Sequence, residues 1–206
     1  MTLGASIAAW GSLILTVVSY TPYIVTTARG RVFPHVFSWF LWSLMGGLIF
    51  AIQVKEGAGP GAWATGLSTA LSFLIFLLAW RRQSVTITTL DKILLGISLV
   101  ALALWMFAKA PLLAVLLLCV ANFTGGHGPT LRKSWANPFG ESVFLFLAGV
   151  LKYFLAVLVL DSFTLTTALF PLGVIVANTT VAVVILARRA VLKARPPSSS
   201  QGDAHP

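Results

Sequence analysis

The sequence predicts an all-α integral membrane protein that crosses the bilayer seven times. Hydrophobic residues make up 58% of the 206 positions and charged residues only 9%, and the mean hydropathy is +0.93. The apolar residues form seven runs that are long enough, or nearly so, to cross about 30 Å of hydrocarbon at about 1.5 Å per helical residue. Basic residues gather in alternate connections between these runs. This composition excludes an ordinary soluble domain, in which about a quarter of the residues are charged.

The predicted spans are bounded by residues that begin or end helices. A Gly-Ala-Gly-Pro break at 57–60 separates the second span from the third. Asp91 suits the N-terminal turn of the fourth, where a carboxylate interacts favourably with the helix dipole, and Pro111 suits the first turn of the fifth. The fourth span is expected to be the shortest. The seven spans are expected at residues 4–26, 33–53, 58–80, 91–108, 111–131, 138–160 and 163–187.

The two ends of the chain are expected to differ. No basic stretch precedes the first apolar run, so we interpret this run as a retained first span and not as a cleaved signal peptide. Residues 190–206 are rich in proline and serine and lack apolar periodicity. We expect them to form a disordered cytoplasmic tail.

The basic residues predict the orientation, because lysine and arginine are retained on the cytoplasmic side. Alternate connections and the tail hold eleven of them, and the other connections hold only Lys55 and Lys109. We therefore expect the N-terminus outside and the C-terminus in the cytoplasm, in a bacterial inner membrane. The eleven are Arg29, Arg31, Arg81, Arg82, Lys92, Arg132, Lys133, Arg188, Arg189, Lys193 and Arg195.

The chain reads as one three-helix unit used twice. Residues 4–82 form the first unit and residues 111–189 the second, and residues 91–108 form a linker helix between them. Three spans end on the side opposite their start, so one extra span lets both units enter from outside and lie parallel. The predicted arrangement is 3+1+3. The aligned pairs are Pro34 with Pro138, Ser38 with Ser142, Trp42 with Phe146 and Ser72 with Thr179.

The sequence resembles the SWEET sugar transporters and the wider PQ-loop (MtN3-like) group over residues 4–189, as a divergent member of bacterial type. The first unit carries a Tyr-Thr-Pro-Tyr-Ile motif at 20–24, with Tyr23 at the place of the PQ glutamine. The remaining residues that carry the resemblance are Ser38, Trp42, Gly46, Gly128, Pro129, Thr130, Lys133, Glu141 and Ser142.

The resemblance implies a transporter that moves a small polar solute, of the sugar, organic acid or amino acid type, by alternating access. Its site would lie at the midplane between the two units. The competing class is a non-transporting seven-helix receptor or assembly module, because a fold does not determine a function. A polar, water-reachable cavity would favour transport over this alternative.

Several polar and aromatic residues lie near the middle of their spans. For Ser68, Ser72 and Thr179 we favour hydrogen bonding between helices, which is common in membrane interfaces. The resemblance implies a solute contact for Asn178, because the family has a substrate-contacting asparagine in its last helix. Ser72 stands near the equivalent position of the first unit, and Asn122 partly replaces the missing second asparagine. The predicted solute-binding residues are Asn178, Asn122, Lys152, Trp42, Ser72 and Phe146.

Lys152 is the most costly residue in the predicted spans, since a charge at this depth is expensive. It either snorkels to the surface or lines a polar cavity, and the sequence leaves both readings open. No acidic residue lies at its depth in the same span. If Lys152 lines a cavity, the solute is its expected partner. A carboxylate or another acceptor-rich group is then favoured over a plain sugar.

Pro22 and Pro129 occupy matching places near the cytoplasmic ends of the first helix of each unit. Proline bends a helix, so we predict gating hinges here, with simple helix ends as the alternative. His127 lies among Gly125, Gly126 and Gly128, where a helix would loosen. For His127 an interfacial position is favoured over a proton-sensitive one.

The chain carries no motif typical of a membrane-embedded enzyme. Paired aspartates, an HExxH motif and a nucleophile with its base are all missing from the sequence. We expect no catalytic residue, no metal and no cofactor. The expected partners are the lipid bilayer and a small polar solute, not nucleic acid. The oligomeric state, including a homo-oligomer, stays open.

Overall fold

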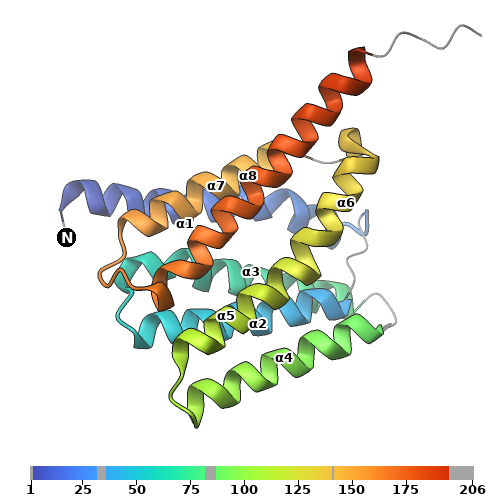
Figure 1. The fold of residues 1–206 in the computed structure, drawn as a ribbon. Coiled ribbons are helices and arrows are strands. Elements are labelled where there is room, and N and C mark those ends of the chain that lie inside the picture. Colours follow the sequence, from blue (N-terminus) through green and yellow to red (C-terminus); the bar gives the residue numbers. More distant parts are fainter. Residues whose placement is uncertain (1, 32–35, 82–86, 141, 195–206) are drawn as a thin grey trace, which may run out of the picture.

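The computed structural model describes residues 2–31, 36–81, 87–140 and 142–194, and within these residues it contains helices and no strand. Figure 1 shows the helices crossing one another as a bundle, with α8 as the longest. The elements are α1 (Leu3–Ala28), α2 (Val36–Lys55), the 3-10 turn η1 (Gly59–Ala62), α3 (Trp63–Trp80), α4 (Thr89–Met106), α5 (Pro111–Asn122), the π-helical turn η2 (Phe123–His127), α6 (Gly128–Ala136), the 3-10 turn η3 (Pro138–Gly140), α7 (Val143–Leu158) and α8 (Leu165–Ala194).

Within the described residues, six segments are long and apolar enough to cross a membrane, and α7 is a shorter apolar helix. The chain is therefore an integral membrane protein. The six are Leu3–Ala28, Val36–Lys55, Gly59–Trp80, Thr89–Met106, Pro111–Ala136 and Leu165–Lys193.

The prediction that the fourth span is the shortest was wrong, because α7 has 16 residues and α4 has 18. The expected span 138–160 begins with a 3-10 turn, and Ser142 has an extended backbone with ψ 109. The regular helix therefore starts only at Val143. Sixteen residues rise about 24 Å, somewhat less than the hydrocarbon thickness.

The helix α1 shows the inverted polarity of a membrane helix. Its buried residues include Ser12, Thr16 and Ser19, whereas Ile7 and Ile14 are 64% and 60% exposed. The three hydroxyls donate to carbonyls of the preceding turn at 2.7, 2.8 and 3.0 Å, so they are satisfied without water. The exposed isoleucines suit contact with lipid, and the buried hydroxyl-bearing side suits contact with the other helices of the bundle.

The predicted helix starts at Asp91 and Pro111 are confirmed. Thr88 and Asp91 form a capping box, in which the Thr88 backbone N–H donates to Asp91 Oδ2 at 2.9 Å. Pro111 occupies the first turn of α5. At the other end of the chain, α8 continues to Ala194. Residues 190–194 are therefore helical and not disordered, because they are mostly good helix formers; residues 195–206 lie outside the described part.

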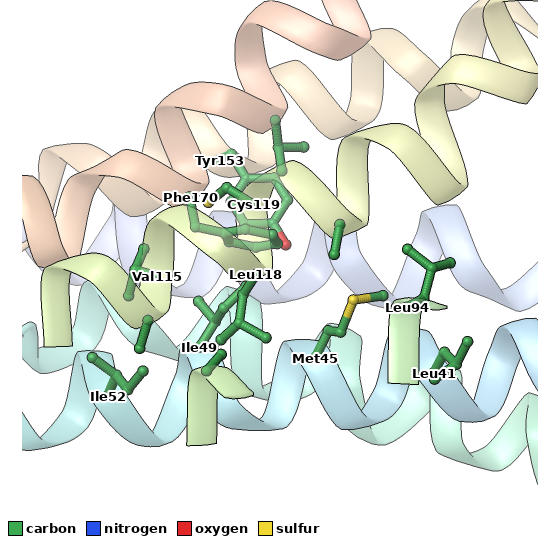
Figure 2. Packing of buried hydrophobic residues seen from close by; sticks show 14 of the residues in the cluster. Leu41, Met45, Ile49, Ile52, Leu94, Val115, Leu118, Cys119, Tyr153 and Phe170 are labelled. Carbon is green, nitrogen blue, oxygen red and sulfur yellow. The ribbon is translucent and has the colours of Figure 1, made fainter. Parts of the chain in front are cut away.

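The helices pack in a repeating pattern. The helix α3 packs against both α1 and α2, and α8 packs against both α5 and α7. Further contacts join α1 to α7 and α2 to α5, and α4 packs on α5 and α2. The main apolar core lies along this last contact. In Figure 2 a stripe on α2, made of Leu41, Met45, Ile49 and Ile52, faces Leu94 of α4 and Val115 and Leu118 of α5.

Charged residues separate along the bundle. Figure 1 shows the C-terminal ends of α1, α3 and α8 and the N-terminal ends of α2 and α4 on its right-hand side. We call this the basic end, since its described charged residues are nine basic ones and Asp91. The opposite end carries Lys55, Glu56, Lys109 and Asp161. The nine are Arg29, Arg31, Arg81, Lys92, Arg132, Lys133, Arg188, Arg189 and Lys193.

Candidate functional site

A cavity of about 550 Å³ lies inside the bundle and has walls from every described long helix except α4. On α1 and α2 its lining residues fall in the half that leads to the basic end: Ser19 to Tyr23 on α1, and Ser38 to Gly46 on α2. On α3 they are Thr65, Ser68, Thr69 and Ser72, mostly in the half that leads away from the basic end, so the cavity lies around the middle of the bundle. All six predicted solute-binding residues line it, namely Trp42, Ser72, Asn122, Phe146, Lys152 and Asn178.

Lys152 is directed into the protein and not toward lipid. Its side chain is 5% exposed, and its Nζ donates to Ser68 Oγ at 2.9 Å. The rings of Tyr20 and Tyr153 lie beside the ammonium, with centroids 5.2 and 4.7 Å from Nζ. This geometry answers the alternative that the sequence left open: the lysine lines the cavity and does not snorkel.

The hydroxyls of α3 both bridge helices and line the cavity. Ser68 accepts from Lys152 and donates its own hydrogen to the Ala64 carbonyl at 2.7 Å, while Ser72 lies 3.3 Å from the Tyr20 hydroxyl. The predicted bonding between helices is thus present at both serines. Thr179, for which the same bonding was expected, is instead exposed on the surface of α8, because it lies one position past the inward-facing Asn178.

The second polar group of the cavity is a pair formed by His127 and Asn178. His127 Nε2 lies 3.3 Å from Asn178 Oδ1, and its Nδ1 has no hydrogen-bond partner among the described residues. The interfacial position favoured for His127 was wrong, since the ring lines the cavity. Gly149 makes room for the pair, because a Cβ there would overlap the Asn178 side-chain amide.

The glycine-rich stretch after Asn122 does loosen the helix, as expected. Phe123–His127 forms a π-helical turn between α5 and α6. Gly126 lets the Trp42 indole approach, since a Cβ would lie 3.3 Å from its Nε1. Such turns inside helices often occur at functional sites. Here the turn brings Gly125, Gly126 and His127 to the cavity wall.

Both predicted hinge prolines lie next to the cavity. Pro22 is inside α1, between the lining residues Tyr20 and Tyr23, and the Val18 carbonyl four residues earlier lacks its usual helical donor. Pro129 is the second residue of α6, and only Gly128 separates it from the π-helical turn. Pro22 therefore does not end its helix, and α1 continues to Ala28.

The end of the bundle away from the basic end is closed by main-chain hydrogen bonds. The N–H of Gly61 donates to the Val159 carbonyl and that of Asp161 to the Ala58 carbonyl, both at 3.1 Å. These bonds join the α2–α3 connection to the α7–α8 connection. Beside them the Gln53 side chain of α2 donates to the Thr167 carbonyl of α8 at 2.8 Å. We call these three hydrogen bonds the closing contacts.

Sequence reasoning missed several residues of the site. Tyr20, Tyr153 and Thr65 line the cavity, and Pro171 lies inside α8 next to the lining residue Phe170. Tyr20 and Pro171 carried a usable signal, because a tyrosine beside Pro22 and a proline within a predicted span both stand out. Thr65 gave none. Glu141, which carried part of the resemblance, lies outside the described residues.

The fold and the cavity define an integral membrane protein with a polar site inside its bundle. No family model, no curated protein and no solved structure matches the chain. The resemblance to SWEET and PQ-loop proteins therefore depends on the residues of this sequence alone.

Proposed function

We propose that this chain is a membrane transporter that moves a small polar solute by alternating access. The observation that carries the proposal is the cavity itself. It lies at mid-bundle and is lined by polar side chains from both halves of the chain, and main-chain hydrogen bonds join the two connections at the end of the bundle away from the basic end. A transporter requires a site of this kind, whereas a purely structural module would fill its centre with apolar side chains.

The packing supports a 3+1+3 organisation of two three-helix units. In the first unit α3 contacts α1 and α2, and in the second α8 contacts α5 and α7. The contacts between the units also correspond, since α1 meets α7 as α5 meets α2. The helix α4 is the linker of this arrangement. The α2–α5 interface between the units is less extensive than the α1–α7 interface, and α4 packs against both α2 and α5 there.

The proposed orientation places the basic end in the cytoplasm, where lysine and arginine are retained. In this orientation the closing contacts form an external gate. Transport then requires that these contacts separate while the helices around Pro22 and Pro129 close the basic end. Both prolines adjoin cavity residues, which supports their role as hinges.

The resemblance to SWEET and PQ-loop proteins belongs to this proposal. Its first motif, residues 20–24, contributes Tyr20 and Tyr23 to the cavity wall, and Ser38, Trp42 and Gly46 also line the cavity. From the second unit Thr130 lines it as well. These six residues therefore gather around one space, as solute-contacting residues of a transporter would.

A solute panel on purified protein tests the proposal. Thermal stabilisation identifies a ligand, because a molecule that binds the native state raises its stability. Flux of that ligand is then measured in liposomes that contain the protein. We expect at least one solute that both stabilises and crosses. Stabilisation without flux would favour a receptor on the same fold, and neither effect across the panel would contradict both classes.

A further inference from the structure

The floor of the cavity carries a lysine, and the described lining residues offer no carboxylate to pair with it. Lys152 is among the described residues that line the cavity, and none of these is an aspartate or glutamate. The ammonium has three N–H groups, of which one donates to the neutral Ser68 hydroxyl. The remaining donors face the ring faces of Tyr20 and Tyr153. An anionic ligand would stabilise the lysine ammonium in these surroundings, because it supplies the missing counterion.

A second donor lies on the same floor. Thr65 is 2% exposed and lines the cavity, and its hydroxyl lies beside the Tyr153 side chain, which lines the same wall. It is one helical turn before Ser68 on α3. A hydroxyl can accept from one neighbour and donate its own hydrogen to another group, so Thr65 can still donate to a ligand oxygen. Lys152 and Thr65 together therefore suit the two oxygens of a carboxylate.

The His127–Asn178 pair supplies a neutral polar group nearer the basic end. Gly149, against which Asn178 packs, precedes Lys152 by three residues, a rise of about 4.5 Å along α7. This spacing corresponds to a few covalent bonds of a ligand. An imidazole and an amide can donate to and accept from a hydroxyl, and Trp42 and Phe146 provide apolar surface for the carbon skeleton.

From these contacts we propose that the site takes a small hydroxylated carboxylate, with its carboxylate on Lys152 and a hydroxyl on the His127–Asn178 pair. The inference builds on the proposed function and names its substrate class. A neutral sugar leaves the Lys152 charge without a counterion. An amino acid brings an ammonium group, for which the described lining offers no acidic side chain.

Two matched ligand pairs test the inference by binding alone. Gluconate is compared with glucose, and lactate with lactamide, by thermal shift and calorimetry on the purified protein. We expect at least one anion to bind more tightly than its neutral counterpart by about 10- to 100-fold, the range for a hydrogen-bonded charged pair. Equal affinity, preference for the neutral member, or no binding in either pair would overturn the inference.

Variants of Lys152 and Thr65 test where the carboxylate of the ligand binds. In Lys152→Met the preference for the anion should disappear, in Lys152→Arg it should be partly kept, and in Thr65→Val it should fall several-fold. Lys109→Met is the matched control, because this exposed lysine lies outside the cavity and should leave binding unchanged. If Lys152→Met does not fold, Lys152→Arg and Thr65→Val still test where the carboxylate binds. Unchanged anion affinity in both variants would contradict its placement on Lys152 and Thr65.

Flux separates the two proposals. Anion binding without flux in liposomes would leave the ligand class standing and contradict transport. Flux of glucose with no response to gluconate would support transport and contradict the proposed ligand class.

Discussion

Gln53 of α2 hydrogen-bonds the backbone carbonyl of Thr167 in α8 at the position where α8 has no donor of its own. The distance from Nε2 to the carbonyl oxygen is 2.8 Å, and Gln53 is fully buried. Pro171 lies four residues after Thr167, and its nitrogen carries no hydrogen for the usual helical bond. A side chain of the first proposed unit therefore completes the backbone of the second, at the end of the bundle that carries the closing contacts.

The first prediction tests this coupling. Gln53→Leu should lower the free energy of unfolding by about 1–3 kcal/mol, because the Thr167 carbonyl is left buried without a donor. In a Pro171→Ala background the new N–H supplies that donor, so the same substitution should cost less. Thermal unfolding of the four proteins in detergent measures the difference as a double-mutant cycle. Equal costs in both backgrounds would show that the two residues act independently.

The second prediction concerns the closing contacts. A Cβ on Gly61 would meet the Leu160 side chain at 2.5 Å and the Ala156 carbonyl at 2.7 Å, so Gly61→Ala should push the two connections apart. A single cysteine at Thr65, just inside this end, should then react faster with an impermeant thiol reagent added from that side. Gly96→Ala is the control, since a Cβ there meets nothing within 4 Å. Unchanged reactivity in Gly61→Ala would contradict a gate here.

The third prediction concerns the room that Gly149 leaves for Asn178. Gly149→Ala would force the Asn178 amide out of its place and separate it from His127. We expect ligand affinity to fall about tenfold, corresponding to one hydrogen bond of about 1 kcal/mol or somewhat more. Isothermal calorimetry gives the affinity, with Gly96→Ala again as control. Binding at wild-type strength would exclude the pair from the ligand site.

The fourth prediction concerns the prolines. If Pro22 and Pro129 bend the gating helices, alanine at either position should slow flux several-fold and leave membrane insertion and folding largely intact, since neighbouring groups can satisfy the backbone. Flux in liposomes measures the transport rate, and the elution profile on size-exclusion chromatography shows whether the variants remain folded. A double variant that transports at the wild-type rate would show that neither proline is a hinge.

The fifth prediction concerns orientation. Single cysteines at Lys55 and Lys109, in a Cys119→Ser background, should react with an impermeant reagent added outside intact cells. One at Arg81 should not. The reason is the separation of basic residues between the two ends of the bundle. The reverse labelling would place the basic end outside.

The sequence by itself determined the features that depend on local composition. Run length and hydropathy predicted several membrane helices to within a few residues, as at Gly59–Trp80 against the expected 58–80. The capping residue Asp91 and the glycines before His127 predicted a helix start and a loosened turn, because caps and glycine act within one helical turn. The position of Lys152 deep in a predicted span indicated that this lysine has a structural or functional role, since the cost of a charge depends on its depth in the membrane.

Only the tertiary structure decided which way these residues face. Lys152 could have snorkelled, and its contact with Ser68 depends on how α7 packs near α3. His127 reaches Asn178 across 51 residues of chain, and Gln53 reaches Thr167 across 114. Apolar side chains occupy both the buried and the exposed sides of these helices, so hydropathy alone does not identify which neighbour a face meets. The packing of small residues such as Gly149 and Gly61 sets that face, through contacts between helices distant in sequence.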